Sequence, residues 1–214
     1  MLGIVIGIAS VVSVVALGEG SRQQVLANIA GLGTNMLEIF PGTGYGDRRS
    51  NLIKTLTVAD AQIVASQPYA DGVTPTVSTS ATLRFGSAEA SGLVNGVGEQ
   101  YFAVRGSTLV QGRFFDEDDV RRLSQDVVID ENTAGVLFGP SGQNPIGSII
   151  LIGSVPSRVI GVMRRQQGGF GASQNPQVFL PYTTVQGRFL GDLSLRALRC
   201  ASATTRRWRR RRLP

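Results

Sequence analysis

The chain opens with an uninterrupted apolar run. Residues 1–18, MLGIVIGIASVVSVVALG, contain no charged side chain, and two serines are their only polar side chains. A helix needs about 20 apolar residues, each rising ~1.5 Å, to span the hydrocarbon core of a bilayer, so this run matches a short span. Polar residues follow at once, namely Glu19, Ser21 and Arg22. The pattern predicts a helix over residues 1–30 whose first part spans a membrane and whose exit lies at Gly18, Glu19, Gly20, Ser21 and Arg22.

Two other interpretations of the apolar run stay open. A cleaved signal peptide begins with positive charge and ends at a small-residue cleavage site, whereas the first basic residue here is Arg22 and no clean Ala-x-Ala pattern follows. A buried element of a soluble protein is also apolar throughout, although 18 residues exceed the length of a typical strand. We therefore favour the membrane helix.

Short strand patterns alternate with short helix patterns from residue 35 onward. The predicted strands are 35–40, 73–80, 126–129, 148–152, 157–162 and 177–180, with a small antiparallel meander over 82–97. Pro75 favours an edge position for the strand over 73–80. The predicted helices are 58–66, a short one near 99–102, one that begins after Asp116, 131–138 and 181–189. Thr57 and Asp60 are expected to cap the helix over 58–66. The helix over 181–189 is expected to expose Thr183, Thr184 and Gln186. This order predicts an α+β fold after one N-terminal helix.

Composition and charge narrow the class of protein. The 214 residues are 42% apolar, which suffices for a core. The net charge of +6 does not describe the body, because eight of the 21 basic residues are arginines at or after Arg196. Residues 1–195 contain 13 basic and 15 acidic side chains, which gives them a net charge of −2. A nucleic-acid-binding surface on the body is therefore not expected.

Several kinds of catalytic chemistry are excluded by missing residue types. The chain has no histidine, one cysteine (Cys200) and one lysine (Lys54), which is not part of a Walker A loop. No histidine-based triad, Cys/His zinc site or nucleotide loop can be built from it. Carboxylates such as Asp116 and Asp130 remain as general acid or base candidates. We expect no enzymatic activity, cofactor or metal in this chain.

Four consecutive acids, Asp116 to Asp119, invite a calcium or magnesium hypothesis. The alternative is that Asp116 caps a helix whose acidic first turn complements the positive helix end. EF-hand spacing and the associated glycine turn are both missing. We therefore favour the cap over the metal site.

The ordered motifs resemble the MacB-like and FtsX-like family of ABC transporter permeases. The resemblance covers about residues 1–190. Its motifs are LGIVIGIASVVSVVALGEGSRQQV, LGTN, EIFPG, LTVADA, VTPTVS, GRFFDEDD, LFGPSGQNPIG, VIGVM and VFLPYTTVQ. It implies a periplasmic core domain over 31–190, made of a porter-like βαβ part and an inserted α+β subdomain at about 82–165. The bulk of the chain would then be periplasmic, anchored by one span in the inner membrane of a bacterium.

The resemblance also implies a function. Such permeases couple ATP hydrolysis on another domain or chain to periplasmic motion that expels macrolides, peptides or lipid-linked substrates. The implied partners are an ABC ATPase domain, a second copy of the chain, a periplasmic adaptor protein, an outer-membrane channel and membrane lipid. We expect Gly18 and Gly20 to set how well the helix transmits motion, since glycine weakens helices. A membrane-tethered periplasmic binding or scaffold module without transport activity is the alternative.

Residues 191–214 depart from the family pattern. The sequence ALRCASATTRRWRRRRLP is rich in arginine and lacks periodicity. We interpret it as a frameshifted or disordered tail, with an arginine-rich nucleic-acid-binding segment as the alternative. The start at Met1, in mid-helix without a basic flank, likewise suggests a fragment of a longer permease.

Overall fold

The computed structural model describes residues 2–31, 36–41, 55–67, 70–165, 175–191 and 195–202. The chain divides into two compact units. One contains the N-terminal helix α1 (Leu2–Gly31), and the other, here called the body, contains all the described strands.

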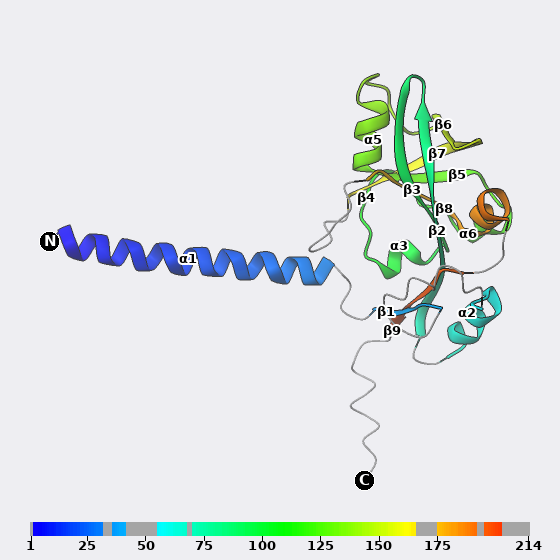
Figure 1. The fold of residues 1–214 in the computed structure, drawn as a ribbon. Coiled ribbons are helices and arrows are strands. Elements are labelled where there is room, and N and C mark those ends of the chain that lie inside the picture. The colour runs from blue at the N-terminus through cyan, green and yellow to red at the C-terminus, as the bar shows by residue number, and fades with distance from the viewer. Residues whose placement is uncertain are drawn as a thin grey trace, which may run out of the picture. The chain divides into compact units, whose positions relative to one another are not determined.

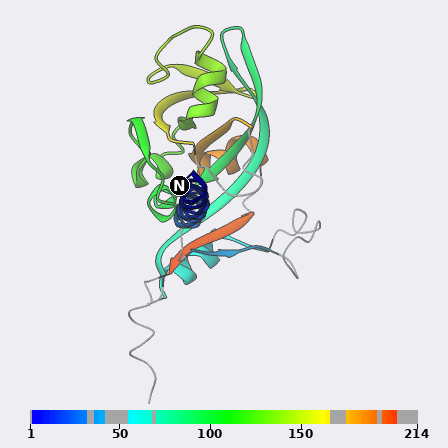
Figure 2. The same ribbon diagram turned by 90° about the vertical axis from the view of Figure 1, so that its left-hand side faces the viewer.

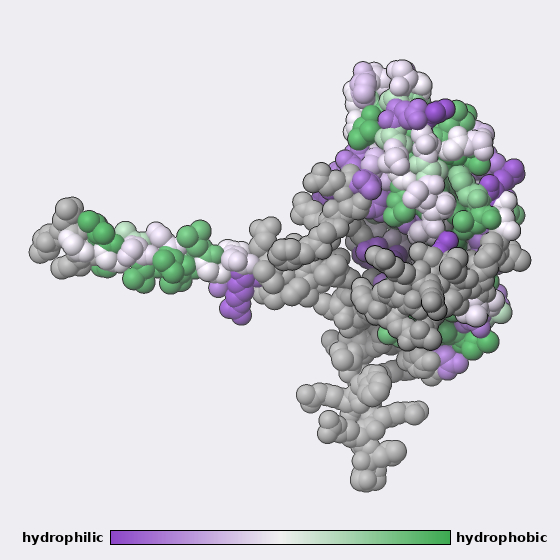
Figure 3. All heavy atoms as spheres, viewed as in Figure 1, coloured by the Kyte–Doolittle hydropathy of each residue, from purple (hydrophilic) through white to green (hydrophobic). Residues whose placement is uncertain are grey.

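Helix α1 is continuous over 30 residues, which confirms that this segment is helical, whereas its membrane span stays a prediction. Its side chains from residue 6 to residue 23 are exposed, including Ile6, Val11 and Leu17 at 60–75%. Figure 3 shows hydrophobic residues along the coloured part of this helix, followed by a hydrophilic group. The hydroxyls of Ser10 and Ser13 donate to the carbonyls of Gly7 and Ala9 at 2.9 and 2.8 Å. Among the described residues, no helix combines the length and the hydropathy that crossing a membrane requires.

The body is built on one mixed nine-stranded sheet (Figures 1 and 2), which confirms the α+β class. Its strands are β1 (Met36–Ile39), β2 (Ala70–Phe85), β3 (Ala88–Val97), β4 (Leu109–Gly112), β5 (Asp126–Asp130), β6 (Ile149–Ile152), β7 (Val155–Met163), β8 (Gln177–Pro181) and β9 (Ala197–Ser202). They follow the order β1-β9-β2-β3-β8-β5-β7-β4, and β6 pairs with β2 and β7. The pairs β3/β8 and β5/β7 are parallel, whereas the other pairs are antiparallel.

Short helices join the strands. They are α2 (Val58–Ala65), α3 (Tyr101–Val104), α4 (Glu117–Arg121), α5 (Glu131–Phe138) and α6 (Tyr182–Val185), which continues into a π-helical turn, η2 (Gln186–Leu190). The predicted cap of α2 is confirmed, because Thr57 and Asp60 each bond to the other's backbone N–H. The predicted helix over 131–138 matches α5 at both ends.

Strand β2 bears on two details of the prediction. It runs unbroken for 16 residues, so residue 82, the predicted start of the inserted subdomain, lies inside a single strand, and the division into subdomains stays a prediction. It is also an interior strand, paired with β9 on one side and β3 on the other, which makes the edge prediction for Pro75 wrong. Neighbouring residues of a strand point their backbone N–H and C=O groups to opposite sides. The Thr76 carbonyl points toward β9, because it accepts a hydrogen bond from the Arg196 N–H. Pro75 therefore turns its nitrogen toward β3, whose pairing begins only at Thr76, so no ladder bond is lost.

Strand β9 corrects the prediction of a disordered tail from residue 191. It pairs antiparallel with β1 and with β2 and lies between them. Leu195, Leu198 and Cys200 are at most 2% exposed. The two leucines pack with Val77 of β2 and with Ala61 of α2. The arginines at 196 and 199 masked this alternation and led to a tail boundary that is too early. Residues 166–174 and 203–214 lie outside the described residues.

Candidate functional site

The predicted exit residues all lie in regular helix. Gly18, Glu19, Gly20, Ser21 and Arg22 are exposed members of α1. Glu19 and Arg22 form an ion pair at 3.9 Å, with both side chains more than half exposed. A Cβ added at Gly18 or Gly20 would meet no atom within 4 Å. The structure therefore presents these residues as one exposed helical turn, and whether this turn transmits motion stays a prediction.

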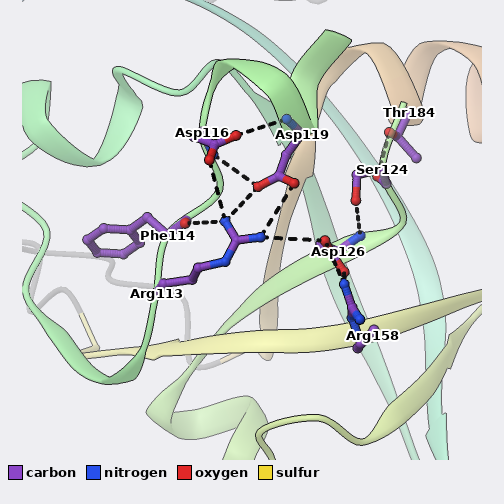
Figure 4. A network of polar contacts seen from close by, with 8 residues as sticks. All are labelled: Arg113, Phe114, Asp116, Asp119, Ser124, Asp126, Arg158 and Thr184. Atoms are coloured by element: carbon purple, nitrogen blue, oxygen red, sulfur yellow. Dashed lines mark hydrogen bonds and ion pairs between the residues drawn. The ribbon is translucent and has the colours of Figure 1, made fainter. Parts of the chain in front are cut away.

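Sequence reasoning missed a network of charged side chains in the body, the Arg113 network, which consists of Arg113, Asp116, Asp119, Asp126 and Arg158 (Figure 4). Arg113 follows β4 and donates to Asp119 Oδ2 at 2.6 Å and to the Phe114 carbonyl at 3.1 Å. Its second terminal nitrogen lies 3.8 Å from Asp126 Oδ2. One guanidinium thus joins the end of β4, helix α4 and the start of β5.

Asp126 is the buried centre of this network. Its side chain is 6% exposed. Arg158 donates two hydrogen bonds to the Asp126 carboxylate, from Nε at 2.9 Å and from a terminal nitrogen at 3.2 Å. The two residues face each other across the parallel pair β5/β7. A fork of two parallel bonds fixes orientation as well as distance. The pairing of β5 with β7 is a long-range feature, so no local signal in the sequence marks Arg158 as the partner of Asp126.

The network holds its charges fixed. The hydrogen bond from Arg113 lowers the pKa of Asp119, against a smaller opposing effect of burial. The same bond raises the pKa of Arg113, and the hydrogen bond to Asp126 raises the pKa of Arg158. Each of these groups is therefore more firmly ionised near neutral pH than it would be alone. Such groups stabilise a geometry and are poorly suited to exchanging protons.

The two carboxylates considered as acid and base candidates serve different helices. Asp116 and Asp119 form a reciprocal capping box at the start of α4, which confirms the predicted cap. Asp130 caps α5 and is 5% exposed. Within the described residues, no group of three or more acidic or cysteine side chains is arranged to hold a metal ion.

Helix α6 makes a second junction with the same region. Thr183 Oγ1 donates to the Val120 carbonyl at 2.6 Å, and Thr184 Oγ1 donates to the Ser124 carbonyl at 2.8 Å. Between these two carbonyls lies Leu123 with φ +50°, the one left-handed non-glycine residue in the described part of the chain. The prediction that this helix exposes Thr184 and Gln186 is wrong, since they are 0% and 4% exposed. Thr184 faces the body because its hydroxyl bonds the Ser124 carbonyl, in the turn that follows α4.

Fixed ion pairs, capped helices and buried hydroxyls define the body as a domain organised to hold its shape. Comparison with known sequences identifies its family. Residues 1–205 match the MacB-like periplasmic core domain, and the chain belongs to this family. The predicted resemblance is thereby confirmed, and the match extends past β9, which lies within the family domain.

Close relatives are named as macrolide export ATP-binding/permease proteins MacB. The protein from Rhodopseudomonas palustris (strain BisB18) is 62% identical over 198 residues, which cover 92% of this chain and 30% of the relative. A MacB from Yersinia pestis bv. Antiqua (strain Antiqua) is 59% identical over 198 residues, with 92% and 29% coverage. The chain thus spans about 30% of the length of these relatives.

Solved structures show the same fold. The periplasmic region of MacB from Actinobacillus actinomycetemcomitans superposes with a TM-score of 0.73 at 36% identity, covering 85% of this chain and 81% of that one. The extracellular domain of the ABC-type transporter YknZ from Gram-positive bacteria gives a TM-score of 0.66 at 20% identity, covering 82% and 88%, and so shares the fold alone. The body is thus a MacB-like periplasmic domain of an ABC transporter permease.

Proposed function

We propose that this chain is the periplasmic core and first membrane helix of the permease subunit of a MacB-like exporter. It couples ATP hydrolysis on another domain or chain to periplasmic motion that expels macrolides, peptides or lipid-linked molecules. The observation that carries this proposal is the family match over residues 1–205, which takes in both α1 and the body. The names of the relatives, which join export with an ATP-binding function, support it.

Helix α1 is the proposed anchor in the inner membrane, with the body in the periplasm. A helix that is apolar on all sides suits either a protein core or a bilayer, and the side chains of α1 from residue 6 to residue 17 are exposed. The polar turn that begins at Glu19 then marks the membrane surface. ATP hydrolysis belongs to a separate ATPase domain in this proposal, and the chain itself is not an enzyme. A second copy, a periplasmic adaptor and an outer-membrane channel complete the proposed assembly.

Two experiments test this proposal. The first expresses the tagged full chain in a Gram-negative host and asks whether it resists carbonate extraction from membranes, with a chain starting at residue 36 as the matched control. We expect the full chain to stay with the membrane and the control to be released. Equal release of both would contradict the anchor.

The second experiment purifies the full chain in mild detergent and identifies bound proteins by mass spectrometry. A permease part should retain an ABC ATPase, whereas a tethered scaffold should remain in the membrane without one. Recovery of the full chain alone, under conditions that keep other ABC complexes intact, would favour the scaffold.

A further inference from the structure

Strand β1 is the first described element after α1, and its Glu38 is held by Arg199 of β9. Arg199 lies opposite Glu38 in β1 and opposite Thr74 in β2, so it stands in the middle of three strands. Its Nε donates to Glu38 Oε1 at 2.6 Å, and the two side chains are 19% and 30% exposed. Partial burial makes this pair less screened by solvent than an ordinary surface pair.

The same guanidinium continues to α3. Arg199 donates from a terminal nitrogen to the Tyr101 hydroxyl at 3.3 Å, and its carbon lies 5.6 Å from the ring centre. Arg105 approaches the same ring at 5.7 Å and donates to the same hydroxyl at 2.9 Å. Cations at this distance are attracted by the ring quadrupole. Tyr101 is 2% exposed, so its position depends on these two partners and on the core around it.

Tyr101 belongs to a cluster of aromatic side chains that extends to the Arg113 network. Its ring contacts Phe179 at 5.7 Å and, edge-on, Phe102 at 5.6 Å. Phe102 stacks on Phe114 at 4.1 Å, and the Phe114 carbonyl accepts a hydrogen bond from Arg113. Direct contacts therefore lead from β1 through β9 and α3 to the loop that precedes α4.

We infer that Arg199 is a positioning residue that couples β1 to α3, through a set of contacts here called the Arg199 link: Glu38, Arg199, Tyr101 and Arg105. The carboxylate of Glu38 orients the guanidinium, and the guanidinium in turn fixes the tyrosine hydroxyl and ring. A displacement of β1 therefore shifts α3 and the aromatic cluster behind it. The use of this coupling in transport rests on the proposed function, whereas the coupling itself is a property of the body.

Native-state hydrogen exchange on the full chain tests the link, because contiguity alone does not establish coupling. The readout is the exchange rate of the α3 amides, those of Val104 and Arg105, which bond to the carbonyls of Gln100 and Tyr101. Glu38→Gln removes the charge that orients Arg199. We expect it to speed exchange in α3 by about threefold or more, with no change in α5.

A matched control is available in the Arg84–Glu89 pair, which has similar geometry at 2.9 Å but joins side chains that are 56% and 53% exposed. Glu89→Gln should leave α3 unchanged. Equal acceleration of α3 and α5 by Glu38→Gln would indicate general destabilisation and overturn the link, as would an unchanged rate in α3.

Tyr101→Phe supplies the second test. This change keeps the ring in the core and removes the hydroxyl that both arginines bond. Glu38→Gln should then have a smaller effect on α3 in the Tyr101→Phe background than in the parent, and an equal effect would overturn the link. None of these measurements needs an ATPase, so failure of the exporter proposal, seen in co-purification, remains separate from failure of the link.

Discussion

Two aspartates of the body cap helices in different surroundings. Asp116 caps α4 with its side chain 69% exposed, whereas Asp130 caps α5 and is buried. The Asp130 carboxylate also accepts from the Thr133 hydroxyl and, at 3.3 Å, from the Gln177 backbone N–H of β8. Loss of Asp130 therefore leaves the backbone N–H groups of Thr133 and Gln177 without this acceptor, whereas the Thr133 hydroxyl keeps the Gln177 carbonyl at 3.0 Å. Loss of Asp116 leaves donors that water can reach.

This contrast gives a prediction for stability. Asp130→Ala should lower the free energy of unfolding by about 3 kcal/mol, because unsatisfied buried donors add to the loss of a cap. Asp116→Ala should cost about 1 kcal/mol, the usual value of a cap alone. Urea unfolding followed by circular dichroism measures both losses. Equal losses would contradict the assigned roles.

A second prediction concerns pH and Asp119. Its pKa is lowered in the folded state by the hydrogen bond from Arg113, so near pH 4 the unfolded chain binds the proton more readily than the folded chain does. The stability that Asp119 contributes is therefore complete above about pH 5 and is lost as pH falls through the lower, folded-state pKa.

The stability difference between the parent and Asp119→Asn should accordingly shrink between pH 6 and pH 3. Thermal unfolding across that range measures it, with the exposed Asp118→Asn as the control. A difference that stays constant with pH would show that the Asp119 charge is not responsible.

At the scale of elements, β4 and β7 meet through a pair of glycines. Gly112 has φ +84°, and a Cβ there would lie 2.1 Å from the Ile160 carbonyl oxygen. Its partner in the register is Gly161, where a Cβ would lie 2.3 Å from the Arg113 carbonyl oxygen. The close approach of these two strands places Arg113 beside β5 and α4.

Gly112→Ala should therefore destabilise the body by more than about 3 kcal/mol, through both left-handed strain and overlap with backbone. Gly153→Ala is the matched control, since Gly153 has φ +60° with no atom within 4 Å of an added Cβ. It should cost about 1 kcal/mol. Similar costs for the two changes, measured by chemical unfolding, would contradict the close approach.

Sequence patterns predicted local structure well because local signals determine it. The caps at Thr57 and Asp116 and the helix over 131–138 follow from neighbouring residues and are confirmed. Strand partners are set by long-range packing, so the interior position of β2 and the existence of β9 were missed. The same holds for the Asp126–Arg158 pair, whose members are 32 residues apart and meet only once β5 and β7 are parallel neighbours.

At the scale of the whole molecule, β9 predicts where the chain can be shortened. A chain ending at Ser202 keeps all described contacts and should unfold at the same temperature as the parent. A chain ending at Leu190 removes Leu195 and Leu198 from the core under α2 and takes β9 away from both β1 and β2. Calorimetry should then show no cooperative transition, and a normal transition would show that β9 is dispensable.

A further prediction concerns α1 in the proposed transporter. Gly18→Ala with Gly20→Ala should strengthen the helix by about 1 kcal/mol per site, without steric conflict within the unit that contains it. If a stiff helix transmits displacement, the doubly substituted permease should export more substrate per ATP hydrolysed, with Ser21→Ala as the control. Unchanged export and ATPase rates would rule out a coupling role for these glycines.

The central position of β9 also has a consequence for how the protein is made. Glu38 and Arg199 are separated by 161 residues, so at about 5–20 residues per second the ribosome needs roughly 8 to 30 s between synthesising one and the other. During that interval β1 lacks its partner strand β9, and the edge of β2 that will pair with β9 has no partner either. Unpaired strand edges readily join other chains. The first part of the sheet is thus the last to close, and in a newly made chain its edges stay open to pairing with other chains until β9 has been made.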